Sequence, residues 1–104
     1  MSGPISFAEF ISSAAASDFK AVKSLSGPLQ ALWLDRVGKW DEAHEAAQAD
    51  DGCDSAWVHA YLHRREGDKS NAAYWYQRAG RPVAVVKLEE EWDEIARTLL
   101  KNTA

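Results

Sequence analysis

The sequence contains few of the residues that indicate a covalently cross-linked framework. It has one cysteine, Cys53, among its 104 residues. A single cysteine cannot form an internal disulfide, so we expect a reducing compartment, the cytoplasm. The carboxylates of Asp50, Asp51 and Asp54 surround Cys53 and disfavour the thiolate that a nucleophile requires. We therefore interpret Cys53 as an incidental thiol in a loop.

Long apolar runs and an excess of basic residues are also missing. No stretch approaches the roughly 18 apolar residues that span a bilayer, and segment 1–20 lacks the basic start of a signal peptide. We therefore expect no membrane partner. The sequence has 12 basic and 16 acidic residues and a formal net charge of -4. Nucleic-acid binding usually requires a positive patch, so we expect no nucleic-acid partner.

Prolines and glycines are scarce, and the few that occur divide the chain into helical segments. There are three prolines and six glycines. Gly38, Gly67 and Gly80 stand where helices commonly end in the left-handed conformation. No segment alternates apolar and polar residues with the period of a strand. We predict a single all-α domain of about six helices. The predicted helices are 6–22, 28–37, 40–48, 54–66, 70–79 and 84–101.

The first and last predicted helices have distinct signatures. Segment 6–22 opens with Ser6 and Glu9, which can satisfy each other's backbone N–H groups as a capping box, and a break near 17–18 is left open. Segment 84–101 has apolar residues at alternating steps of three and four, as on an amphipathic helix. We interpret its acidic run, 89–91, as a solvated face, and the binding of a basic partner is the alternative. The apolar stripe consists of Val85, Leu88, Trp92, Ile95 and Leu99.

Two passages of the sequence align with each other. Gly38 and Gly67 are 29 residues apart, and so are Ala43 and Ala72. In each passage a helix ends at glycine and an alanine follows five residues later, where a small side chain lets two antiparallel helices approach closely. We therefore predict two antiparallel hairpins. They cover residues 28–49 and 54–80.

This pattern resembles the tetratricopeptide-repeat family, which places small residues, a turn glycine and an aromatic residue in a pair of helices. The first hairpin matches in part, because Ala47 stands where the family has an aromatic residue, and the offset differs from the usual repeat of about 34 residues. The resemblance covers residues 28–82. Passage 56–68 is also similar to short bacterial proteins. The matching residues of the second hairpin are Ala60, Gly67, Ala72, Tyr76 and Ala79.

The resemblance implies a protein-interaction module that binds a peptide on the face formed by the first helix of each hairpin. Arginine beside aromatic residues suits a peptide carboxylate, because a guanidinium group can donate two hydrogen bonds to it. Ordinary core packing of the aromatic residues is the alternative. The identity of the partner and self-association are left open. The expected lining residues are Leu32, Arg36, Trp57, Tyr61, Arg64 and Arg65.

The three histidines form a second candidate site. His59 and His63 are four residues apart and share one helix face, and His44 could approach them from the preceding hairpin. Two imidazoles at this spacing can bind one metal ion, with Glu45 and Glu66 as further oxygen ligands. A hydrogen-bonded polar cluster between helices is the alternative. We assign no cofactor and no enzyme activity, and keep a small metal- or ligand-binding protein or enzyme as the alternative to the interaction module.

Overall fold

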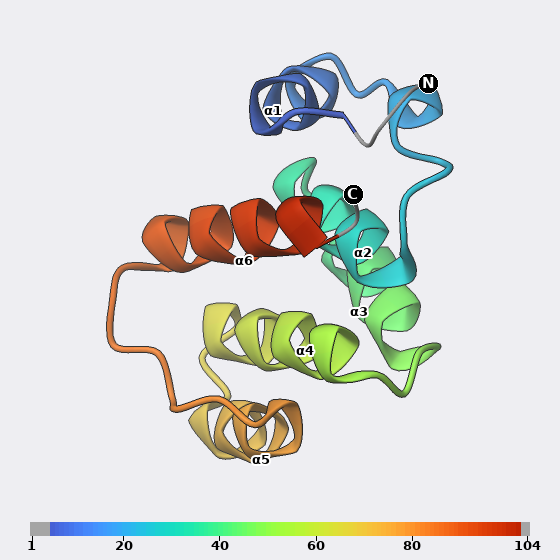
Figure 1. Cartoon of the computed structure of the whole chain (residues 1–104). Helices are drawn as coiled ribbons and strands as arrows, with labels where there is room; N and C mark the ends of the chain where they lie inside the picture. The colour runs from blue at the N-terminus through green and yellow to red at the C-terminus, as the bar shows by residue number, and fades with distance from the viewer. Residues whose placement is uncertain (1–4, 103–104) are drawn as a thin grey trace.

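The computed structural model describes residues 5–102, which form an all-α fold (Figure 1). This range contains six α-helices, one short 3-10 helix and no strand, which confirms the predicted fold class. No helix of the described range has both the length and the apolar character needed to cross a membrane. The elements are α1 Phe7–Ala15, η1 Phe19–Ala21, α2 Gly27–Arg36, α3 Trp40–Gln48, α4 Cys53–Arg65, α5 Lys69–Ala79 and α6 Leu88–Asn102.

Short turns at two glycines join α2 to α3 and α4 to α5, and these two pairs make the most extensive contacts between helices. Gly38 and Gly67 both have a φ of 89°, a left-handed conformation that costs glycine little. In the first turn the N–H of Lys39 donates to the carbonyl of Leu34, which satisfies the end of α2. The four helices begin and end within one residue of the predicted segments 28–49 and 54–80.

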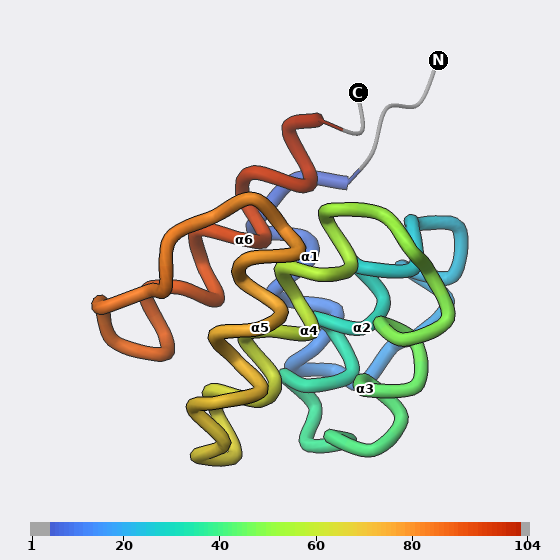
Figure 2. Tube along the Cα trace, turned by 90° about the horizontal axis from the view of Figure 1, so that it is seen from below, coloured from blue at the N-terminus to red at the C-terminus, as the bar shows by residue number. Residues whose placement is uncertain are grey.

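The last helix, α6, lies between α1 and α4 in Figure 1 and also contacts α2. Its buried side includes Trp92 and Ile95, which are 1% and 0% exposed. The Trp92 ring stacks on that of Phe10 with centroids 5.7 Å apart. Figure 2, seen from below, shows α6 toward one edge of the molecule and the hairpin of α2 and α3 toward the opposite edge. The helix therefore completes the core by covering one side of both hairpins.

The predicted start of the last helix at residue 84 is wrong, because α6 begins at Leu88. Segment 81–87 is not helical, and Val85, which we expected on the apolar stripe, is 93% exposed. The β-branched valines of this segment have a low helix propensity. The acidic residues 89–91 favour a helix start at this point, because the positive end of the helix dipole attracts negative charge.

The first helix is also shorter than the predicted segment 6–22. The capping box of Ser6 and Glu9 is present, but α1 ends at Ala15. Ser17 then adopts a left-handed conformation with a φ of 53°. The chain continues into η1, so the break near residues 17–18 occurs and divides the predicted helix in two.

Candidate functional site

All three histidines of the chain meet at one place between the two hairpins. His44 comes from α3, and His59 and His63 come from α4. One ring nitrogen of each lies within 4.8 Å of the others. The Nε2 atoms of His44 and His59 are 2.9 Å apart, so one donates a hydrogen bond to the other. Residues that are 15 positions apart in the chain thus form a single cluster.

The helix geometry explains this meeting. His59 and His63 are one turn apart on α4, and their rings stack with centroids 4.9 Å apart and planes 24° apart. The packing of α3 on α4 brings His44 across them, nearly perpendicular to both rings. His59 is 3% exposed and His63 is 9% exposed, whereas His44 is only partly buried. The cluster therefore reaches the surface on the side of His44.

Two tryptophans hold the outer faces of the cluster. The Trp75 ring of α5 stacks on His59 with centroids 3.9 Å apart, and the Trp40 ring stacks on His44 with centroids 5.1 Å apart. The Trp40 indole N–H donates to the carbonyl of Leu62 at 3.0 Å, which fixes the plane of that ring. The imidazole orientations are thus determined by packing from three helices.

The surroundings of His59 and His44 favour the neutral form of both rings. Burial, followed by the neighbouring His44 and His63, lowers the pKa of His59 to about 4. Burial and His63 also lower the pKa of His44, while the carboxylates of Glu66, Asp41 and Glu45 act in the opposite direction. At neutral pH these imidazoles are therefore uncharged and keep the lone pairs with which a ring nitrogen binds a metal ion.

A carboxylate orients the third histidine. His63 Nδ1 lies 2.7 Å from Oε1 of Glu66, which leaves Nε2 as the ring nitrogen available for a ligand. Asp68 also lies within 4.8 Å of this pair, but its carboxylate accepts hydrogen bonds from the backbone and side-chain nitrogens of Asn71 at the start of α5. Glu66 therefore serves as a partner of a ring nitrogen, in the way that carboxylates support metal-bound histidines.

Three of the predicted peptide-binding residues, the leucine and the two aromatic ones, are buried. Leu32, Trp57 and Tyr61 are 0%, 3% and 2% exposed, so none of them presents a surface to solvent. The helix α6 lies over this side, and the Trp92 indole N–H donates to the carbonyl of Leu32 at 3.0 Å. Burial and the carboxylate of Asp35 raise the pKa of Tyr61 to about 12. These three side chains belong to the core in this arrangement.

The three predicted arginines differ in what they contact. Arg64 donates to Glu91 of α6 at 2.8 Å. Arg36 and Arg65 remain exposed and line one polar hollow of about 320 Å³. Arg65 Nε lies 3.1 Å from the buried Asp35 Oδ1, which accepts no well-directed hydrogen bond from the described residues. The other residues that line this hollow are Asp35, Tyr61, Glu89 and Trp92.

The interpretation of residues 89–91 as a wholly solvated face is wrong at its last residue. Glu91 is 1% exposed, and its oxygens accept hydrogen bonds from Arg64, from the Tyr76 hydroxyl at 2.5 Å and from the Trp57 indole at 3.4 Å. Glu91 precedes Ile95 by four residues, so it shares the buried face of α6. That spacing is a signal that sequence reasoning could have used.

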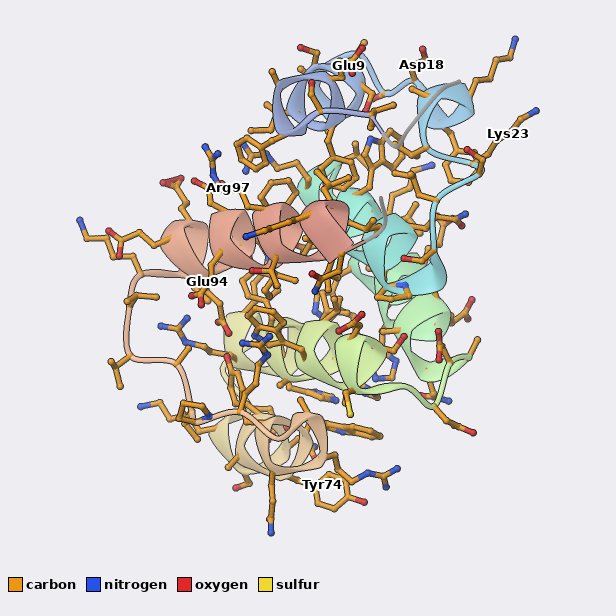
Figure 3. All side chains as sticks on the ribbon, in the orientation of Figure 1. Glu9, Asp18, Lys23, Tyr74, Glu94 and Arg97 are labelled. Atoms are coloured by element: carbon orange, nitrogen blue, oxygen red, sulfur yellow. The ribbon has the colours of Figure 1, made fainter. Side chains whose placement is uncertain are left out.

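Sequence reasoning also missed Trp40 and Trp75 as parts of the histidine cluster. Neighbouring side chains of a helix point in different directions, so Tyr74 and Trp75 of α5 cannot face the same side. Tyr74 is the exposed one at 49%, and Figure 3 shows it on the outer side of α5, away from the helices. Trp75 points inward to His59, a contact between different helices that no local pattern encodes.

Comparison with known proteins found no matching family model, no matching curated protein and no matching solved structure. The resemblance to tetratricopeptide repeats therefore stays a prediction, and the case for function is built on the geometry of the described residues.

Proposed function

We propose that the protein binds a divalent transition-metal ion through the ring nitrogens of His44, His59 and His63. The observation that carries the proposal is that all three histidines of the chain lie with ligand atoms within 4.8 Å of one another. Three imidazoles form a ligand set that suits zinc, copper, nickel or iron, with further positions left for water or a substrate. Scattered surface histidines would not have this arrangement.

The spacing of the nitrogens is close to that of a coordination sphere. Two nitrogen ligands of a tetrahedral zinc ion, each about 2.0–2.1 Å from the metal, are about 3.3 Å apart. The Nε2 atoms of His44 and His59 are already 2.9 Å apart. A small outward rotation of the partly buried His44 would replace their hydrogen bond by two bonds to an ion. His44 and His59 thus need little change in spacing to share an ion, and a ring nitrogen of His63 lies within 4.8 Å of both.

The surrounding charges favour a cation over an anion. The carboxylates of Asp41, Glu45 and Glu66 act on His44, and Glu66 also contacts His63 directly. Burial lowers the pKa of both His59 and His44, so these two imidazoles are neutral at pH 7 and do not repel a cation. The ion would connect α3 of one hairpin to α4 of the other and would stabilise the fold.

The test measures zinc binding by the tag-free protein, because a histidine tag would bind metal itself. Purified protein is stripped with a chelator, dialysed and titrated with Zn²⁺ by isothermal calorimetry, and its metal content is measured by elemental analysis. We expect about one ion per chain, and an increase in the free energy of unfolding of about 2.7 kcal/mol when free Zn²⁺ is 100-fold above Kd.

The variants His44→Ala, His59→Ala and His63→Ala should each abolish this binding while circular dichroism shows the same helix content. Asp41→Asn is the matched control, since it removes a nearby charge but no ring nitrogen. Less than about 0.2 ion per chain, together with no heat of binding, would contradict the proposal, because a working site retains its ion. Equal binding by the alanine variants would contradict it as well.

A protein-interaction module is the second candidate function, and one observation favours it. The exposed guanidinium groups of Arg36 and Arg65 share a hollow, where Arg36 lies 4.5 Å from the centroid of the Trp92 ring and Arg65 is held by Asp35. Two oriented guanidinium groups suit a carboxylate of a partner peptide. The candidate thus rests on this hollow alone, because Leu32, Trp57 and Tyr61 are buried.

An acidic peptide library with a fluorescent label tests this candidate. Arg36→Gln with Arg65→Gln should abolish binding of any peptide that the wild type retains. Arg97→Gln is the control, because Arg97 lies over Phe7 of α1 and does not line the hollow. If the double variant retains the same peptides, the hollow is not the binding site.

A further inference from the structure

A second cavity lies on the other side of the first hairpin, between the turn after α1 and helices α2 and α3. Its volume is about 310 Å³, at the lower end of the range for small-molecule sites. It contains none of the three histidines and none of the residues around the Arg36 and Arg65 hollow. Four polar and four apolar residues line it, the polar ones being Ser17, Gln30, Lys39 and Glu42. The apolar lining residues are Phe19, Trp33, Leu34 and Val37.

The turn after α1 shapes one wall of this cavity. The left-handed Ser17 reverses the chain, and the N–H of Asp18 donates to the carbonyl of Ser13 at 2.9 Å. The chain then places Phe19 against Trp33, with ring centroids 5.7 Å apart and planes 68° apart. Trp33 is 3% exposed, so the part of this pair that a ligand can reach is the Phe19 ring.

Of these two rings, Trp33 is held in place by hydrogen bonds, whereas Phe19 is partly exposed. The Trp33 indole N–H donates to Ser13 Oγ at 3.0 Å, and Ser13 Oγ donates to the carbonyl of Phe10 at 2.8 Å. Phe19 is 43% exposed, although burial of a phenyl ring is favourable. A flat apolar ligand would cover the exposed part of Phe19 without moving Trp33.

The rim of the cavity carries one cation and one anion. Lys39 Nζ lies 4.0 Å from Glu42 Oε2, and their side chains are 58% and 61% exposed. An exposed pair at this distance contributes little, so the ammonium group can turn to another carboxylate at low cost. Glu42 would compete for Lys39 and would repel an anionic ligand. Removing the charge of Lys39 should therefore weaken the binding of an anionic ligand, and removing the charge of Glu42 should strengthen it.

We infer that this cavity binds a small aromatic carboxylate, with the ring against the exposed Phe19 and the carboxylate beside Lys39. The apolar walls exclude a highly charged ligand, and the volume suits one or two fused rings. Lys39 of the rim can exchange its weak contact with Glu42 for a contact with the carboxylate of a ligand. This site does not depend on the histidine cluster, so either proposal can fail without the other.

The test uses 1-naphthoate as the probe and uncharged 1-naphthamide as its matched control. Two-dimensional NMR of the ¹⁵N-labelled full chain locates the site, because Trp33 lines the cavity and its indole N–H gives a signal of its own. We expect saturable shifts of this signal and of the Val37 amide. Lys39→Gln should weaken naphthoate binding about two- to fivefold and Glu42→Gln should strengthen it, while naphthamide binding stays unchanged.

Two further variants address the apolar walls. Val37→Phe should fill the cavity and abolish binding, and Phe19→Ala should weaken it at least about tenfold without affecting the fold, since Phe19 is on the surface. Circular dichroism and the thermal midpoint verify that both variants are folded. Shifts that miss the cavity would overturn the inference, as would full binding by a folded Val37→Phe variant. Equal responses of naphthoate and naphthamide to Lys39→Gln would overturn the role of the carboxylate.

Discussion

The imidazole ring of His59 on α4 is stacked on the indole ring of Trp75 on α5, with centroids 3.9 Å and planes 16° apart. This contact crosses the second hairpin and fixes the plane of a proposed metal ligand. A metal–imidazole bond is directional, since the lone pair lies in the plane of the ring. Neighbours that fix the orientation of a metal-binding side chain therefore contribute to the affinity of the site for the metal.

We expect Trp75→Leu to weaken Zn²⁺ binding about 10-fold or more, because His59 can then rotate away from the ligand geometry. Isothermal calorimetry measures the affinity. Tyr74→Leu is the matched control, because Tyr74 is 49% exposed and contacts Trp75 and Arg78 but not His59. If both variants bind zinc as tightly as the wild type, the stacking contact does not support the site.

The metal-free protein should lose stability as the pH falls from about 6.5 to about 4. Its His59 has a pKa of about 4 when folded, whereas an unfolded histidine titrates near 6.5. Between these values the unfolded chain takes up a proton that the folded chain does not, so the free energy of unfolding decreases. The loss is on the order of 3 kcal/mol at most, since one pKa unit is about 1.4 kcal/mol.

Urea denaturation of chelator-treated protein at several pH values measures this loss. Carboxylates also titrate over this range, so the comparison uses His59→Gln, which has no titrating ring and keeps the other groups. We expect the variant to lose less stability than the wild type over the same pH change. Parallel curves for the two proteins would show that His59 does not cause the pH dependence.

Glu91→Ala should lower the free energy of unfolding by about 3–5 kcal/mol. The substitution leaves the Arg64 guanidinium and the Tyr76 hydroxyl without their carboxylate partner in the interior. Urea denaturation measures the change, and Glu90→Ala is the control, because exposed Glu90 should change stability by less than about 0.5 kcal/mol. Similar costs for both variants would mean that the buried network contributes nothing beyond helix propensity.

Ser17→Gly should raise the free energy of unfolding by about 0.5–1 kcal/mol. The left-handed conformation of Ser17, with a φ of 53°, costs an L-residue roughly 1–2 kcal/mol that glycine avoids. Part of that gain is offset by the greater freedom of glycine in the unfolded chain. Thermal denaturation measures the result. Ser12→Gly is the control, because the same exchange inside α1 should destabilise the protein by a similar amount. Destabilisation by Ser17→Gly would contradict this account.

The local features of the fold could be predicted because each depends on a few neighbouring residues. Gly38 and Gly67 mark the turns of the hairpins, and the spacing of His59 and His63 places them on one face of a helix. Helix capping and left-handed turns act within one turn of the chain, so a short sequence window contains the whole signal. The non-helical segment 81–87 is longer than predicted. The low helix propensity of its residues is a weak signal, and the strong apolar stripe of the following helix outweighed it.

The sequence by itself determined the four helices of the hairpins, the two hairpin turns and the pair of histidines on α4, because hydrogen bonds and side-chain spacing within a helix are local. Only the tertiary structure decided that His44 joins that pair, that Trp75 packs on His59, and that α6 covers the side where a peptide was expected. Glu91 illustrates the reason, since a carboxylate is buried only where partners such as Arg64 and Tyr76, distant in sequence, supply its hydrogen bonds.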